Sequence, residues 1–147
     1  MKLWQKDKVS LKEVETFTVG KDREMDMYLA AFDVIGSLAH IEMLESVGLL
    51  TKNELLELQT ELKTIYQQIQ KGDFRLQDNT EDIHSQVELL LTKKLGDTGK
   101  KIHSARSRND QVLVDVKLFL RNELEELVKT IQPFFALLQS QSEKYKE

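Results

Sequence analysis

The sequence has 147 residues, of which 40% are hydrophobic and 31% charged, with one proline and six glycines, a composition that favours a soluble helical domain with a sizeable core. The formal net charge of −4 and the lack of any basic run longer than a pair argue against a nucleic-acid-binding surface. The absence of cysteine excludes disulfides and thiolate metal sites, and without a signal-peptide pattern or a long apolar run we expect a cytoplasmic protein that does not enter a membrane.

The first predicted helix follows a weakly patterned stretch. Residues 1–20 hold isolated apolar side chains at Trp4 and Phe17, and we expect an extended arm or a short helix there. From residue 22 to 46 apolar residues recur on more than one helical face, which indicates a helix buried among neighbours. Its polar side chains are spaced 7, 4 and 3 residues apart and share one face: Asp26, Asp33, Ser37 and His40. The pattern leaves open whether that face is a solvated stripe or lies close to a ligand.

Two further helices are predicted before residue 100. The sequence T-K-N-E at 51–54 is a capping box that opens the second helix, and a glycine ends its stripe of leucine and isoleucine. The third helix is expected to begin at Glu81, capped by Asn79 or Thr80. His84 then lies one residue beyond the buried face, where a histidine is usually partly exposed and without a role. The G-D-T-G sequence that follows this helix is typical of a flexible loop.

The segment Lys101–Gln111, with the sequence KIHSARSRNDQ, carries the densest group of chemically active side chains. Ser107 is the expected N-cap of the next helix, with a weaker form of the capping box completed three residues on. Arg108 and Asn109 then lie in the first turn, where a guanidinium, an amide and free backbone N–H groups suit a carboxylate or a phosphate. Spacing alone favours a plain capped helix start with solvated arginines over such a site.

The last predicted helix is the longest, running from residue 108 to about 145, or roughly 55 Å. Pro133 lies inside it and should kink or break it. The pattern continues almost to the last residue, so we expect the chain to be a fragment of a longer protein. One apolar stripe follows the helix at spacings of 3 or 4, as in a bundle or a coiled-coil arm: Leu113, Val116, Leu120, Leu124, Leu127, Ile131, Phe134 and Leu138.

Three segments together resemble the argininosuccinate lyase family of the fumarase/aspartase superfamily. His103–Gln111, HSARSRNDQ, is similar to the family's signature H-T-G-R-S-R-N-D-Q, and Glu81–His84, EDIH, is similar to a second family segment. The run Asp33–Ser37 followed by Ala39–His40 is similar to a third. The three occur in the family's order and at its approximate separations, and the resemblance covers nearly the whole chain. The S-R-N-D-Q form resembles this branch rather than the other lyases of the superfamily.

The resemblance implies an all-α fold, with an amino-terminal helical domain at 1–107 and the first rod of a central bundle at 108–147. Lyases of this family split argininosuccinate into arginine and fumarate by β-elimination, without metal or organic cofactor, as homotetramers formed through that bundle. Their catalytic base lies in a G-S-S segment and their acid in another segment, and neither is present here. The chain alone is therefore expected to be inactive.

The resemblance also implies roles for five residues. Asp26 falls where an aspartate contacts the arginine end of the substrate, as a carboxylate suits a guanidinium. Ser107, Arg108 and Asn109 match the positions that bind the fumarate-forming part. His84 matches a histidine close to bound substrate, which gives it a supporting catalytic role.

Some features fit the family less closely or leave alternatives open. Gly20-Lys-Asp22 stands where the family has paired serines, and Ala105 replaces a glycine, which disfavours a positive φ there. The carboxylates of Glu81 and Asp82 are expected to raise the proton affinity of His84. Only three histidines occur and none form an H-x-x-x-H pair, so no metal site is expected. The alternatives are a sister lyase acting on another succinyl-type substrate and a non-enzymic, crystallin-like protein on the same scaffold.

Overall fold

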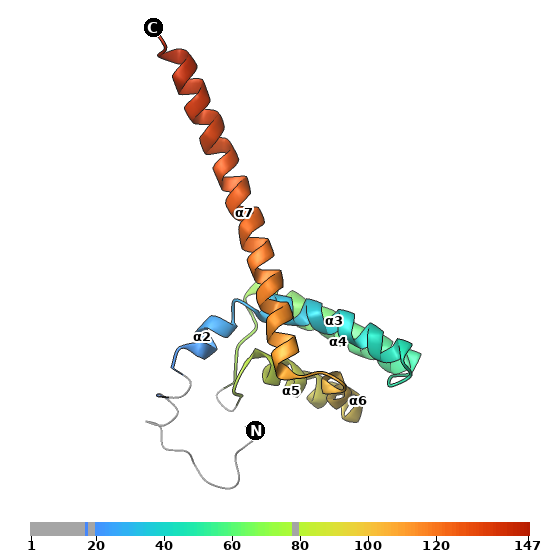
Figure 1. Cartoon of the computed structure of the whole chain (residues 1–147). Helices are drawn as coiled ribbons and strands as arrows, with labels where there is room; N and C mark the ends of the chain where they lie inside the picture. The colour runs from blue at the N-terminus through green and yellow to red at the C-terminus, as the bar shows by residue number, and fades with distance from the viewer. Residues whose placement is uncertain (1–16, 18–19, 78–79) are drawn as a thin grey trace.

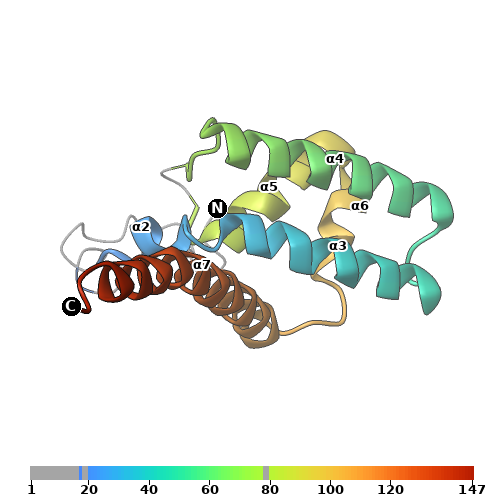
Figure 2. The same cartoon turned by 90° about the horizontal axis from the view of Figure 1, so that it is seen from above.

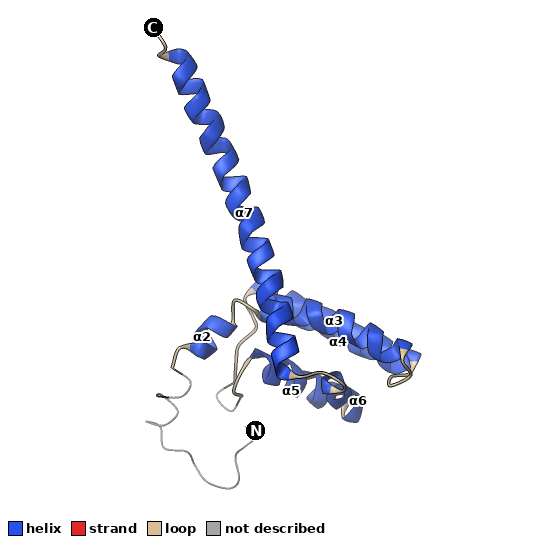
Figure 3. Ribbon diagram, in the orientation of Figure 1, coloured by secondary structure: helices blue, strands red, loops and turns tan. Residues whose placement is uncertain are grey.

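The structure is a computed structural model that describes residue 17 and residues 20–77 and 80–147. The prediction for residues 1–20 therefore lies almost entirely outside the described residues. The described part of the chain is helical and contains no strand, so the predicted all-α class is confirmed (Figure 3). Its elements are α2 (Asp22–Asp26), α3 (Ala30–Ser46), α4 (Lys52–Lys71), α5 (Ile83–Leu95), α6 (Asp97–Lys100), the 3-10 turn η1 (Lys101–His103) and α7 (Arg108–Lys144).

A small helical layer forms the base of the molecule, and α7 leaves it as a single long rod (Figure 1). Helices α3 and α4 lie side by side, and α5 packs against both of them (Figure 2). Fully burying one leucine or isoleucine side chain contributes about 1.5–3 kcal/mol to folding. One apolar core holds the layer together: Ala30, Val34, Ile41, Leu44, Leu50, Leu58, Leu62, Ile65, Phe74, Ile83, Val87, Leu91 and Ile102.

Local sequence signals account for most of the helix ends. The predicted capping box is confirmed, since the Thr51 hydroxyl accepts from the Glu54 N–H and the Glu54 carboxylate accepts from the Thr51 N–H. Gly72 ends α4 with a φ of 75°, a conformation that glycine adopts without steric cost. The predicted cap of α5 is wrong. Asp82 is its N-cap and accepts from the Ser85 N–H at 2.6 Å, while Thr80 is buried elsewhere.

Two predicted segments differ from the structure. The helix expected over 22–46 is divided into α2 and α3, because residues between them form tighter turns in which, for example, the Leu29 N–H donates to the Asp26 carbonyl at 2.9 Å. The prediction of a flexible loop at 96–99 is wrong, because Gly96 is the N-cap of the short helix α6 and the other three residues lie in that helix. Gly99 is buried so closely against the Leu91 backbone that a Cβ would overlap the Leu91 carbonyl group.

Helix α7 spans 37 residues and is not broken at Pro133. Its first turns pack on α3, where the rings of Phe32 and Phe119 meet edge to face with centroids 5.9 Å apart. Beyond that contact the rod is exposed, and no helix of the described ranges is both long and apolar enough to cross a membrane. Seven residues of the predicted stripe are more than half exposed: Leu113, Leu120, Leu124, Leu127, Ile131, Phe134 and Leu138.

Candidate functional site

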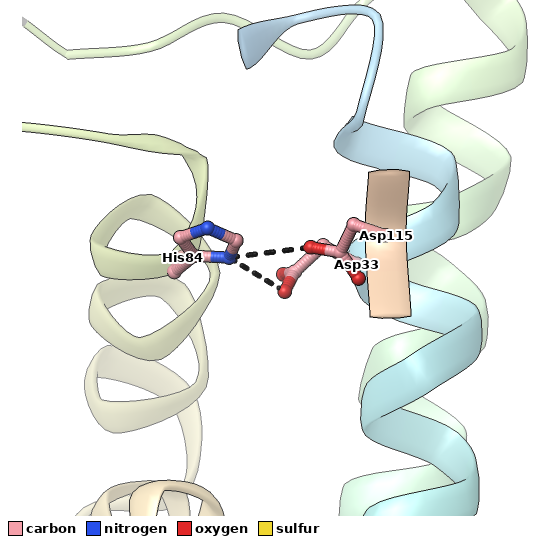
Figure 4. A group of neighbouring side chains, drawn as sticks. All are labelled: Asp33, His84 and Asp115. Carbon is pink, nitrogen blue, oxygen red and sulfur yellow. Dashed lines mark hydrogen bonds and ion pairs between the residues drawn. The ribbon is translucent and has the colours of Figure 1, made fainter. Parts of the chain in front are cut away.

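Three helices bring one buried ionisable side chain each to the junction of α3, α5 and α7. The His84 Nδ1 atom lies 2.8 Å from Asp33 Oδ1 and 3.6 Å from Asp115 Oδ2, as Figure 4 shows. The exposed fractions are 1% for Asp33, 4% for His84 and 1% for Asp115. A buried charge is costly unless another charge or a proton compensates it, so these three groups determine each other's state.

Protonation of Asp115 relieves part of this cost. Burial, followed by the negative charge of Asp33, raises the pKa of Asp115 to about 7, while His84 and Arg106 act in the opposite direction. Near neutral pH the Asp115 carboxyl therefore carries a proton for much of the time, as expected for two carboxyls placed close together away from water. Among the described residues, neither oxygen of Asp115 has a hydrogen-bond partner.

A chain of hydrogen bonds leads from this cluster to the start of α7. Asp33 Oδ1 accepts from the His84 ring and also from the Gln111 amide nitrogen, at 2.5 Å. The Gln111 amide oxygen accepts from Arg108 Nη1 at 3.0 Å. The Arg108 Nε atom in turn lies 3.6 Å from Asp82 Oδ2, at the start of α5. The guanidinium is thus held between the first turns of two helices.

The start of α7 has the predicted capping box. The Ser107 hydroxyl accepts from the Asn109 N–H at 3.2 Å, and the Ser107 N–H donates to Asp110 at 3.3 Å. Ala105, two residues before the cap, has a φ of 56°, so the expectation that alanine avoids positive φ here is wrong. The chain must turn from η1 into α7 within four residues, and the packing of both elements imposes this strained conformation.

A small cavity of about 110 Å³ adjoins the cluster and runs along the polar face of α3. Arg106 borders it and donates to the Ser37 hydroxyl at 3.3 Å, and burial lowers the pKa of this arginine. Gly36 also lines it, where a Cβ would come within 3.3 Å of the Val114 side chain. The polar face of α3 is therefore no solvated stripe, because Asp33 and Ser37 are both buried against neighbouring elements.

Residues 8–147 match the model of a protein family described as "Lyase". The chain belongs to this lyase family. It is 59% identical over 145 residues to the argininosuccinate lyase of Bacteroides thetaiotaomicron, an alignment that covers 99% of this chain and 32% of that protein. It is 60% identical to the argininosuccinate lyase of Phocaeicola vulgatus, covering 99% and 33%, and 43% identical to that of Thermotoga neapolitana, covering 86% and 32%. The chain thus spans about a third of the length of the curated relatives that it matches.

Within this lyase chain, the predicted site residues fall into two groups. Asp26, His84 and Arg108 lie around the start of α5, where Asp26 accepts from the Ile83 N–H at 3.3 Å and burial raises the pKa of Asp26. Ser107 and Asn109 are exposed at the start of α7. The Asn109 side-chain amide has no hydrogen-bond partner among the residues that the structure describes.

Three important residues of the lyase chain were missed in the sequence. Arg106, Gln111 and Asp115 were not among the predicted site residues, although Gln111 and Asp115 share a helical face with Arg108 through spacings of 3 and 4. The structure gives the His84 ring a hydrogen bond to the buried Asp33 carboxylate, a partner that the sequence did not predict. A run of polar residues on one face of an apolar helix is the signal that could have found them.

The cluster also bears on metal binding. One ligand atom from each of Asp33, His84 and Asp115 lies within 4.8 Å of the others, so their geometry could admit a small divalent cation. The H-x-x-x-H criterion could not have found this group, since its members come from three helices. The surroundings disfavour a cation, because the Gln111 amide and the His84 ring already donate to Asp33 Oδ1 and the positive charge of Arg106 acts on both carboxyls. The donor set fits an internally compensated ionic network better than a metal site.

Proposed function

We propose that this chain supplies the amino-terminal part of an argininosuccinate lyase, which splits argininosuccinate into arginine and fumarate by β-elimination. The observation that carries the proposal is the start of α7, where a capped helix N-terminus presents Arg108 and an unpartnered Asn109 amide. Such a helix start favours anions through its free N–H groups and partial positive charge. The names of the relatives, at about 60% identity over nearly the whole chain, support the choice of substrate.

The reaction needs a carboxylate to be held while negative charge builds on it. A base removes a proton from the carbon next to this carboxylate, and the resulting carbanion is stabilised as an aci-carboxylate. We assign Arg108 and Asn109 to that group, because a guanidinium and a directed amide donor stabilise charge that develops in the transition state. The Ser107 hydroxyl already caps α7, so it keeps the first turn in place and borders the bound anion. No metal or organic cofactor is required.

The other two assigned residues lie across the site. Asp26 is half-buried beside the start of α5 and supplies a carboxylate for the guanidinium at the arginine end of the substrate. His84 has its Nδ1 hydrogen directed to Asp33, which leaves the Nε2 lone pair unprotonated when the ring is neutral. Figure 4 shows that this second nitrogen is turned away from both carboxyls. We assign it a supporting role in orienting substrate or moving a proton.

The base and acid of the reaction are not assigned to this chain, which contains no G-S-S segment. We propose that residues 1–107 form the amino-terminal domain and that residues 108–147 begin a central bundle. In that arrangement the exposed stripe of α7 is covered by other helices in a cytoplasmic homotetramer. The 147-residue chain alone should then release no fumarate from argininosuccinate.

The test is a chimera in which this chain replaces the corresponding 32% of the Bacteroides thetaiotaomicron argininosuccinate lyase. We expect the chimera to release fumarate, measured by absorbance, and Asn109→Leu to lower its turnover about a hundredfold, since loss of one such donor costs on the order of 3 kcal/mol. The matched control is Asn53→Leu, because Asn53 occupies in α4 the position that Asn109 occupies in α7, the second residue after the N-cap. Normal turnover in Asn109→Leu, or an inactive but correctly assembled chimera, would refute the proposal.

A further inference from the structure

Gln111 is the one residue that joins the buried cluster to the start of α7 directly, among the residues described. Its side chain is buried, with 6% of the residue exposed. The amide uses both ends, donating to Asp33 Oδ1 at 2.5 Å and accepting from Arg108 Nη1 at 3.0 Å. The orientation of the amide is unambiguous, because an arginine only donates and an ionised carboxylate only accepts.

We propose that Gln111 is a positioning residue that holds the Arg108 guanidinium in the orientation needed to bind a substrate carboxylate, with buried Asp33 as its anchor. The inference rests on the proposed function of Arg108 and extends it to a residue that does not touch substrate.

Glutamine meets a requirement here that other side chains of similar size do not. Glutamate would still accept from Arg108, but it would place a third carboxylate beside Asp33 and Asp115 and could not donate to Asp33 when ionised. Methionine would fill a similar volume and make neither bond. Because Asp33 is also bonded to the His84 ring, the anchor is fixed by two elements, and the orientation of Arg108 is tied to the junction of α3, α5 and α7.

The remaining contacts of Arg108 are weaker and do not define its orientation alone. Its Nη2 atom lies 3.5 Å from the Ser85 hydroxyl, and its Nε atom lies 3.6 Å from Asp82. A guanidinium binds a carboxylate through two parallel N–H groups, so a rotation of its plane removes one of the two bonds. Without Gln111 the guanidinium would keep its charge but lose the preorganised plane.

The kinetic test uses the chimera described above and a double-mutant cycle. We expect Gln111→Met to lower kcat/KM about tenfold, the scale of one lost bond of a bidentate pair. Gln111→Glu should also lower kcat/KM, and it replaces Gln111→Met in the test if Gln111→Met does not fold. The double variant Gln111→Met with Arg108→Lys should be no worse than Arg108→Lys alone, because both changes remove the same interaction. Additive losses, or an unchanged kcat/KM in Gln111→Met, would overturn the inference.

Gln86→Met is the matched control for a purely structural effect. Gln86 is 1% exposed and accepts from the Gln77 N–H and the Thr80 hydroxyl, both at 2.9 Å, and none of its hydrogen bonds is to Arg108. Gln86→Met should lower the melting temperature and leave kcat/KM unchanged.

A spectroscopic measurement on the 147-residue chain separates this inference from the proposed function. The Nη–H resonances of Arg108 should exchange with solvent faster in Gln111→Met than in the unsubstituted chain, because Gln111 accepts from Nη1, and Gln86→Met should not change them. If the exchange rate does not respond to Gln111→Met, the inference fails even when the chimera is active. If it responds as expected while the chimera is inactive, the proposed function fails and the anchoring of Arg108 stands.

Discussion

Replacing Asp115 by asparagine should remove the loss of folding stability that the Asp115 carboxyl causes as it ionises with rising pH. The pKa of Asp115 is raised from 3.8 to about 7, so between these values the folded chain holds a proton that the unfolded chain releases. The stability that this carboxyl contributes is therefore fully present below about pH 4 and is lost as the pH rises through about 7. At about 1.4 kcal/mol for each pH unit, the full effect is about 4 kcal/mol, of which about 2 to 3 kcal/mol falls between pH 5 and pH 8.

The assay is denaturant unfolding at pH 5 and pH 8, followed by circular dichroism at one protein concentration. Asparagine resembles the protonated acid in shape and does not titrate, so the variant should show a stability difference between the two pH values that is smaller by about 2 to 3 kcal/mol. Asp73→Asn is the control, because Asp73 is exposed and makes no contact with the cluster that the structure records. Equal differences in Asp115→Asn and the unsubstituted chain would refute the buried, proton-sharing description of the site.

Three further outcomes follow from the structure. Ala105→Gly should stabilise the chain by about 1 kcal/mol, because it relieves a positive φ, whereas Ala39→Gly in exposed helix should destabilise it by a similar amount; thermal unfolding measures both. Gly99→Ala should cost roughly 2 kcal/mol by forcing its Cβ into the Leu91 backbone, and a wild-type melting temperature would contradict this. Leu124→Glu should weaken self-association of the chain in sedimentation experiments, and unchanged association would exclude the α7 stripe as the contact surface.

The secondary structure was largely predictable because its signals are local. Two capping boxes, a glycine at the end of α4 and a regular apolar stripe along α7 each act over a few residues, and all are present as expected. The failures arise where tertiary packing overrides a local preference. Ala105 adopts a conformation that alanine avoids, and Gly99 belongs to a packed helix because its missing side chain lets two backbones approach.

The candidate site was predictable only in part. The residues at the start of α7 belong to one continuous segment, and their order shows that they meet at a helix N-terminus. The cluster of Asp33, His84 and Asp115 joins three helices, and no spacing within the chain shows that these side chains converge. Asp115 in particular lies on a helix whose sequence pattern is dominated by an apolar stripe. Nothing in that pattern predicts that this carboxyl is buried near the start of the helix.

The position of the proposed site residues on α7 would tie the proposed ligand recognition to the proposed assembly. Arg108, Gln111 and Asp115 occupy the first two turns, and the same helix continues as an exposed apolar rod to Lys144. A continuous helix is stiff over such a length, so a movement of its far end is transmitted to its first turn, where the Arg108 guanidinium lies. If neighbouring helices packed poorly against the apolar stripe near Lys144, the whole helix would rotate, and the plane of the Arg108 guanidinium would rotate with it. A substitution many turns away, touching no ligand, would then be detected first as weaker binding.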